Sequence, residues 1–282
     1  MSTLAHPGIK QAQWRRRVSA LPGKVWVGAA IVAMFLLIAV CAPLLAPFSP
    51  LAQDPINRLA SLSARHWLGT DELGRDTFSR LIYATRVDLP IGLLGAAAPA
   101  LVGTLLGVVA GYFGSWVDAV IMRIADIMQA FPSYILIIGL VAAFGQGAIT
   151  IVIAFTVLGW VVYARLIRTE VIRIASLAYI QAAQTAGLPE YRVIRYHVLP
   201  NVVGQTLVYV PSDIMFATLG LAAFSYLGLG VPAPTAEWGE MIAAGQPYLR
   251  EQWWLATVPG LVLVIYGFGL QLLGEGFEEA QR

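Results

Sequence analysis

A small set of charged side chains lies within stretches of sequence that are otherwise apolar. Asp118, Arg123 and Asp126 occur in the run VDAVIMRIADIMQAFP, and Asp213 follows Pro211 in another apolar segment. A charge deep in a lipid bilayer is costly, so such residues form pairs, line water or lie at the interface. Arg123 precedes Asp126 by three residues, which favours an ion pair on one helical face. Asp213 is a candidate for lining a pathway or for bonding neighbouring helices.

The motifs by which proteins commonly bind nucleotides or catalyse hydrolysis do not occur in the sequence. It has no GxxxxGK[ST], HExxH or GxSxG string. The three histidines, His6, His66 and His197, are far apart in sequence and make no recognisable metal set. The single cysteine, Cys41, excludes an internal disulfide. We therefore predict no catalytic residue, no metal site and no cofactor bound by this chain.

The composition is that of a membrane protein. Of 282 residues, 58% are hydrophobic and 12% charged, whereas soluble domains have about a quarter charged residues. Apolar runs long enough to cross a bilayer occur at about 25–45, 89–113, 117–144, 149–167, 202–229 and 255–273. The sequence therefore predicts an all-α membrane protein with six transmembrane helices.

The charges at the start of the chain indicate its orientation. Residues 1–24 are basic and contain no acid, which predicts a cytoplasmic N-terminus. The apolar run 25–45 exceeds the 7–15 residues or so of a signal peptide, and no A-x-A site follows it, so we expect a retained helix. Beyond it we predict an extracytoplasmic connection at 46–87, a core of five helices at 88–276 and a cytoplasmic tail at 277–282.

Glycine and proline predict features inside the spans. Gly103, Gly107 and Gly111 fall four residues apart, which allows two membrane helices to approach closely. Pro132 lies inside the third span, and Pro211 with its neighbouring acid is expected to interrupt the fifth.

The two outer connections contain further local signals. Thr77 to Arg86 is expected to form a short amphipathic helix leading into the membrane, with Asp71 or Asp76 as a helix cap. The connection before the last span has an excess of acids, which suits the outer side. Its tryptophans fit an interfacial aromatic belt: Trp238, Trp253 and Trp254.

A polar, basic stretch separates the fourth and fifth spans, and its excess of arginine predicts a cytoplasmic loop at about 175–201. In its segment YIQAAQTAGLPEYRVIRYHVLPN, Gly187 is expected to close one short helix and Pro189 to begin a second. The second helix has an apolar stripe at helical spacing: Val193, Ile194, Val198 and Leu199. Two interpretations fit this pattern: a docking surface for a partner, or an amphipathic loop lying on lipid headgroups.

The same stretch resembles the EAA loop of permeases from binding-protein-dependent ABC importers. The resemblance rests on Gln-Ala-Ala, on the glycine and on the Leu-Pro-Asn ending, although the family usually has Glu where this chain has Gln181. HWLGTDELGRD and FSYLGLGVPAPTAEWGEMI resemble the peptide and nickel branch of that family. The resemblance implies that the ATPase-coupling residues are Gln181, Ala182, Ala183, Ala186, Gly187, Leu199, Pro200 and Asn201.

The resemblance also implies a type I importer bundle, partners and a location. In this family the loop lies in a groove of a cytoplasmic ATPase, which binds ATP and Mg²⁺. The expected partners are a second homologous permease subunit, two ATPase subunits and an extracytoplasmic substrate-binding protein, with no nucleic acid. The expected location is the bacterial inner membrane, with several spans and both termini in the cytoplasm.

The function implied is ATP-driven import, and peptides are the first expectation for the substrate. Nickel or a nickel complex, glutathione and opines are alternatives within the same branch. In these systems a separate binding protein largely determines the substrate specificity, so the permease sequence is a poor guide to the ligand. Two other classes remain open. An ion-coupled secondary transporter would use Asp126 or Asp213 as a cation or proton site. A structural membrane scaffold would show no flux that depends on an ATPase.

Overall fold

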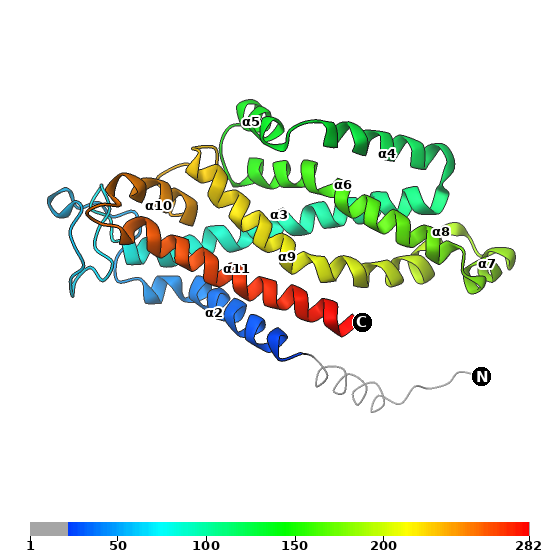
Figure 1. Cartoon of the computed structure of the whole chain (residues 1–282), viewed down its shortest axis with the longest axis horizontal. Helices are drawn as coiled ribbons and strands as arrows, with labels where there is room; N and C mark the ends of the chain where they lie inside the picture. Colours follow the sequence, from blue (N-terminus) through cyan, green and yellow to red (C-terminus); the bar gives the residue numbers. More distant parts are fainter. Residues whose placement is uncertain (1–21, 282) are drawn as a thin grey trace.

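The computed structural model describes residues 22–281, and the regular elements in this range are all helical (Figure 1). The α-helices are α2 Gly23–Leu45, α3 Thr77–Phe113, α4 Ser115–Ala130, α5 Ser133–Phe144, α6 Ala148–Ala175, α7 Ala178–Thr185, α8 Glu190–Val193, α9 Leu199–Tyr226, α10 Trp238–Gly245 and α11 Trp254–Gln281. Short 3-10 helices occur at Pro55–Asn57 and Gln246–Tyr248, and a π-helical turn at Ile194–Val198 joins α8 to α9.

The helices account for the six predicted spans. Five are long and apolar enough to cross a membrane, and the bent pair α4 and α5 makes a sixth when counted as one span. The all-α membrane fold is therefore confirmed. The differences from the sequence-based expectations concern where the helices begin, end and bend.

The third span is not one helix with a proline inside it, as we had expected. It divides into α4 and α5, whose axes are bent by 92°. Phe131 takes an extended conformation with φ −87° and ψ 137°, and Pro132 is the residue directly before α5. A residue before proline is pushed out of the α region, which explains why the helix ends here.

Two predicted elements form one helix at the start of the core. The expected amphipathic helix from Thr77 and the span from Leu89 are both parts of α3, which has 37 residues and is about 55 Å long. The side chain of Asp76 caps it by accepting a hydrogen bond from the Ser79 amide at 2.8 Å. The capping role predicted for Asp76 is confirmed, and the helix expected from Thr77 to Arg86 continues into the membrane span without interruption.

Later boundaries also differ from the prediction. Pro211 lies inside α9 without ending it, so the predicted interruption of the fifth span is wrong. The second helix of the predicted pair runs through the π-helical turn directly into α9. The last helix extends to Gln281, so most of the predicted tail at 277–282 is helical.

The glycines on α3 serve close packing against α6, as predicted. A Cβ on Gly103 would lie 2.3 Å from the carbonyl oxygen of Trp160, and one on Gly107 would lie 2.6 Å from that of Ala164. Contacts this short do not occur for real Cβ atoms, so any larger residue separates the two helices. The α3–α6 pair at the centre of the bundle therefore depends on these glycines.

Gly103→Leu is expected to destabilise the protein by about 1–3 kcal/mol, because the side chain overpacks the α3–α6 contact. Thermal unfolding in lipid nanodiscs measures the effect. Gly260→Leu in α11 is the matched control, since a Cβ there would meet nothing within 4 Å. Equal unfolding temperatures for the two variants would contradict the close packing.

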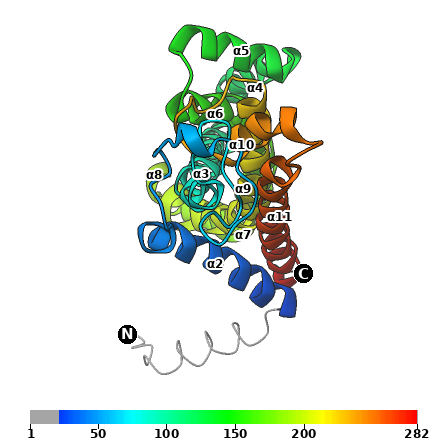
Figure 2. The same ribbon diagram turned by 90° about the vertical axis from the view of Figure 1, so that its left-hand side faces the viewer.

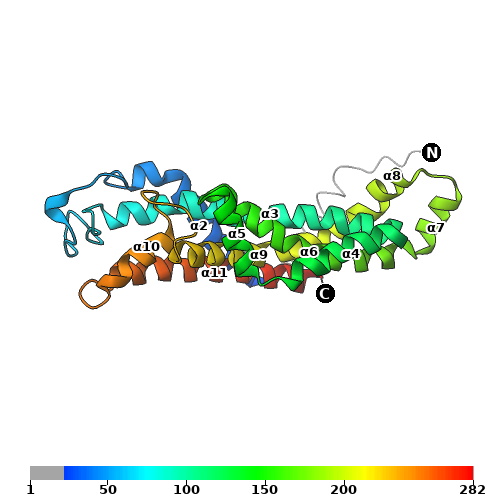
Figure 3. The same cartoon turned by 90° about the horizontal axis from the view of Figure 1, so that it is seen from above.

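The bundle is elongated, with different structures at its two ends (Figure 3). Residues 46–76 and α10 lie at one end, and α7 and α8 lie at the other (Figures 1 and 3). In Figure 2, α2 and α11 lie together on one side of the bundle and α5 lies on the opposite side. Lys24 at the start of α2 forms ion pairs with Glu275 and Glu279 near the end of α11, so these two helix ends are neighbours. Most of the basic residues from which we predicted a cytoplasmic N-terminus belong to segment 1–21, which lies outside the residues that the structure describes.

Candidate functional site

The segment from Ala178 to Asn201, called the hairpin below, has the predicted helix–glycine–helix shape. Helix α7 ends at Thr185, and Gly187 has φ +79°, in the left-handed region. The Gly187 amide donates to the Gln184 carbonyl at 2.9 Å, and the Leu188 amide donates to the Ala183 carbonyl at 3.2 Å. These two bonds form the Schellman motif that ends many helices. The structural part of the prediction for Gly187 is confirmed.

The apolar stripe of the hairpin is covered by this chain. Ile180, Val193 and Val198 are fully buried, and so is Val202 directly after the hairpin. They form one cluster with residues near the ends of α3 and α6: Val108, Ile167, Val171 and Ile174. The hairpin is thus packed onto two membrane helices through a continuous apolar core, which leaves little of the stripe for lipid. A force applied to the hairpin would be transmitted to both helices.

The opposite face of the hairpin is open to solvent. Six of the eight residues singled out in the sequence are exposed: Gln181, Ala182, Ala186, Gly187, Pro200 and Asn201. Ala183 and Leu199 are half-buried and pack against the apolar cluster instead. The exposed residues come from both the start and the end of the hairpin, where the Asn201 side chain donates to the Tyr179 hydroxyl at 3.5 Å.

Sequence reasoning missed two aromatic residues on the exposed side of the hairpin. Tyr191 and Tyr196 are 63% and 64% exposed, and each is covered on one face by an arginine, Arg192 or Arg195. Tyrosine and arginine are enriched in protein interfaces, so these residues extend the candidate docking surface. The alternation of Tyr and Arg in EYRVIRY was the available signal.

The acids of the third span form ion pairs across helices rather than within one. Asp126 accepts from Arg165 at 2.7 Å, and Asp118 is paired with Arg168, so both join α4 to α6. The predicted Arg123–Asp126 pair is wrong. The spacing of three residues made that pair possible, but the arginines of α6 supply the partners. This arrangement favours a structural role for both acids.

Asp213 lies elsewhere, in a central hollow between α3, α6 and α9. The hydroxyl of Tyr163 on α6 donates a hydrogen bond to its carboxylate. The hollow has a volume of about 240 Å³. Its residues come from three helices: Gly95, Pro99, Phe155, Leu158, Gly159, Val162, Tyr163, Asp213, Phe216 and Ala217. The predicted alternatives for Asp213, a helix-bonding role and a pathway-lining role, are therefore both compatible with its position.

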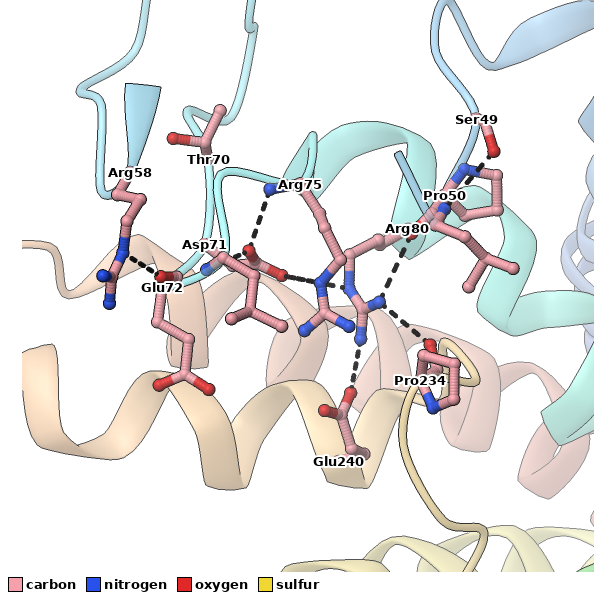
Figure 4. Close-up of polar contacts among 12 residues, drawn as sticks. Ser49, Pro50, Arg58, Thr70, Asp71, Glu72, Arg75, Arg80, Pro234 and Glu240 are labelled. Atoms are coloured by element: carbon pink, nitrogen blue, oxygen red, sulfur yellow. Dashed lines mark hydrogen bonds and ion pairs between the residues drawn. The ribbon is translucent and has the colours of Figure 1, made fainter. Parts of the chain in front are cut away.

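At the far end of the bundle, charged residues from the connection and from α10 form a buried cluster (Figure 4). Arg80 on α3 donates to Glu240 on α10 at 2.6 Å, and Arg75 donates to Asp71 at the same distance. Each arginine is only 2% exposed. Burial raises the pKa of the Glu240 carboxyl above its usual value, and the positive charge of Arg80 opposes that rise. The cluster ties the connection to the membrane core.

Trp238 belongs to this buried end and not to an interfacial belt, so that prediction was wrong. It is fully buried, and its backbone amide donates to Asp88 at 3.2 Å while its indole donates to the Leu81 carbonyl at 3.3 Å. Its ring packs edge-on against Phe35 and Tyr266. Of the three tryptophans, Trp253 has the exposure expected of a belt residue, at 56%.

Family comparisons agree with this architecture. Residues 103–280 match the family described as "Binding-protein-dependent transport system inner membrane component". Residues 25–62 match the N-terminal transmembrane domain of oligopeptide transport permease C. Together these matches cover the first span and nearly all of the core.

Several curated proteins are similar along most of their length. The chain is 38% identical over 254 residues to a dipeptide transport system permease protein of Alkalihalophilus pseudofirmus, covering 90% of this chain and 84% of that protein. It is 37% identical over 251 residues to a probable D,D-dipeptide transport system permease protein of Escherichia coli, with coverages of 89% and 84%. It is 36% identical over 271 residues to an oligopeptide transport system permease protein of Bacillus subtilis, with coverages of 96% and 88%.

A solved structure supports the fold independently. The crystal structure of an amino acid ABC transporter with histidines superposes with a TM-score of 0.54, covering 72% of this chain and 94% of that chain at 14% identity. At this identity the similarity concerns the fold alone. With the family matches and the relatives above, it leads to one conclusion. The chain belongs to the binding-protein-dependent transport system inner membrane components, in the group of ABC importer permeases that includes oligopeptide permease C.

Proposed function

We propose that this chain is the permease subunit of an ATP-driven importer for di- and oligopeptides, and that the hairpin receives the motion of a partner ATPase. The observation that carries the coupling role is the exposed face of a hairpin whose other face is buried against α3 and α6. The peptide substrate is supported by the relatives, which are dipeptide and oligopeptide permeases and match about nine tenths of the chain.

The connectivity of the hairpin supports a mechanical role. Helix α7 follows α6 after a turn of two residues, and α8 continues through the π-helical turn into α9. When two ATPase subunits close on ATP, displacement of the hairpin would move α6 and α9, which are directly connected to it, and α3, which packs against it. These helices also hold Tyr163 and Asp213, so the motion would reach the central hollow.

The partners in this proposal are a second homologous permease, two cytoplasmic ATPase subunits and an extracytoplasmic binding protein. ATP and Mg²⁺ bind to the ATPases, and this chain is non-catalytic. In this proposal the membrane is a bacterial inner membrane. The hairpin, the start of α2 and the end of α11 lie on its cytoplasmic side. Nickel, nickel complexes, glutathione and opines remain alternatives for the substrate within the same mechanism.

The competing proposal of an ion-coupled transporter has lost one of its candidate acids, because Asp126 is paired with Arg165. The two mechanisms differ in what drives uptake. Proteoliposomes containing the complete complex should accumulate a labelled dipeptide only when ATP is inside and loaded binding protein is outside. Uptake driven by an ion gradient without ATP would overturn the proposal.

Ala182→Glu is expected to weaken docking of the ATPase by about tenfold, because it puts an unpaired charge in the centre of the contact. Ala182 is the better position than the neighbouring Ala183, which is half-buried and supports the hairpin's own packing. The measurement is the amount of ATPase that purifies with the complex over a concentration series. Ala42→Ser in α2, at the far side of the bundle, is the control for membrane insertion. Undiminished docking of Ala182→Glu would contradict the assigned surface.

A further inference from the structure

Asp213 and Tyr163 lie close to the middle of the helices that contain them. Asp213 is 14 residues from the start of α9 and 13 from its end, so about 20 Å of helix extends on either side. Tyr163 is 15 residues from the start of α6 and 12 from its end. Tyr163 is 3% exposed, whereas Asp213 is half-buried and faces the central hollow. The pair therefore places an acid far from both ends of the bundle.

The surroundings of Asp213 contain no cation among the residues that line the hollow. The walls are mostly apolar and aromatic, including Phe155 and Leu158. At the mouth, Val162 and Phe216 are 63% and 64% exposed, so the hollow opens onto the surface of the bundle. A carboxylate can accept about four hydrogen bonds, and Tyr163 supplies one. The remaining oxygen lone pairs are available to a ligand.

Two other acids on the membrane helices provide a contrast. Asp118 and Asp126 are each paired with an arginine of α6. An acid at membrane depth without a cationic partner is a default functional candidate, because its charge is costly unless something compensates it. In the described part of the chain, no arginine or lysine performs this role for Asp213. The compensating cation can instead arrive with the transported molecule.

We propose that Asp213 binds the N-terminal ammonium group of a peptide during its passage, with Tyr163 positioning the carboxylate. The proposal rests on the proposed function and deepens it by naming the recognised group. An unblocked peptide always carries this ammonium, whereas its side chains vary. The apolar walls can accept side chains of different shapes, so one fixed ionic contact combined with permissive walls suits a peptide permease. The hollow's open mouth would face the pathway formed with the second permease.

The test uses the complete importer in proteoliposomes and two probes, the dipeptide Ala-Phe and lactoyl-phenylalanine. The second compound has a hydroxyl in place of the N-terminal ammonium. Affinity of each for the binding protein is measured separately, and uptake is compared at saturation. We expect the wild-type importer to transport Ala-Phe about tenfold faster per loaded binding protein. Asp213→Asn should remove this preference by slowing Ala-Phe alone.

Two further variants separate this role from a structural one. Tyr163→Phe retains the carboxylate and should retain a preference for Ala-Phe. Ser212→Ala changes the adjacent side chain, which lies against Gly274 on α11, and should leave both rates unchanged. Equal slowing of both probes by Asp213→Asn, or no preference in the wild type, would overturn the role of Asp213. Failure of the wild type to transport either probe, in a complex that hydrolyses ATP, would instead overturn the proposed peptide function.

Discussion

Gly187→Val is expected to reduce ATP-driven uptake by up to about a hundredfold while leaving the amount of permease in the membrane unchanged. Gly187 has φ +79°, and a β-branched residue in this region is strained by about 1–3 kcal/mol. No neighbouring atom lies within 4 Å of the position of an added Cβ, so the effect comes from the backbone and not from a clash. The turn should open and misplace Ala182 and Ala186 on the proposed docking surface.

Two control variants separate the backbone strain at Gly187 from the effect of adding a side chain. Gly187→Asn should retain most activity, because asparagine tolerates the left-handed conformation. Gly204→Val lies in α9, where an added Cβ also meets nothing within 4 Å, and φ is not positive. Uptake, co-purified ATPase and the membrane level of the permease are measured for all three. Wild-type uptake by Gly187→Val would count against the hairpin as the coupling element.

Local signals explain which features the sequence could predict. The shape of the hairpin follows from one glycine and one proline at fixed offsets, and both act on the backbone next to them. The Gly103 face follows from helical periodicity, because residues four apart lie on the same side of a helix. Asp76 as a cap is also a local effect. Each of these predictions depends on only a few residues close together in sequence, so it can be made without knowledge of the fold.

Features that depend on distant residues were missed or misassigned. Asp126 had a plausible partner three residues away, but the fold brings Arg165 to it from another helix. Likewise, Arg80 and Glu240 are 160 residues apart, and nothing in either segment indicates the other. Trp238 fitted an interfacial position by its sequence context, yet the same residue is fully buried. Ion-pair partners and burial are properties of the assembled bundle.

The strength of a bend is another property that composition does not determine. Proline inside an apolar run can produce a mild kink or a complete break. Pro211 leaves α9 continuous, whereas Pro132 accompanies a 92° change of direction. The second case includes an extended Phe131 directly before the proline. The surrounding helices decide between the two outcomes.

Arg80→Met is expected to destabilise the permease by about 3–5 kcal/mol, the second large effect that the structure predicts. Arg80 is 2% exposed and is paired with Glu240 at 2.6 Å and with Asp71 at 3.4 Å. It also donates to the Pro234 carbonyl at 3.3 Å (Figure 4). Methionine has a similar length without the charge, so it leaves Glu240 without its cationic partner, while Asp71 keeps its ion pair with Arg75 and most of the packing is preserved. Thermal unfolding of the purified complex in nanodiscs measures the loss.

A second substitution distinguishes a lost charge balance from lost packing. In Arg80→Met with Glu240→Met, the carboxylate left without its partner is also removed, so the double variant should be more stable than the single variant. Arg173→Met breaks an exposed pair with Glu170 and should change the unfolding temperature much less. If Arg80→Met behaves like Arg173→Met, the buried cluster does not hold the connection to the core. If the double variant is the least stable of the three, the packing and backbone contacts of Arg80 contribute more to stability than its charge. In that case packing, and not ion pairing, holds the connection to the core.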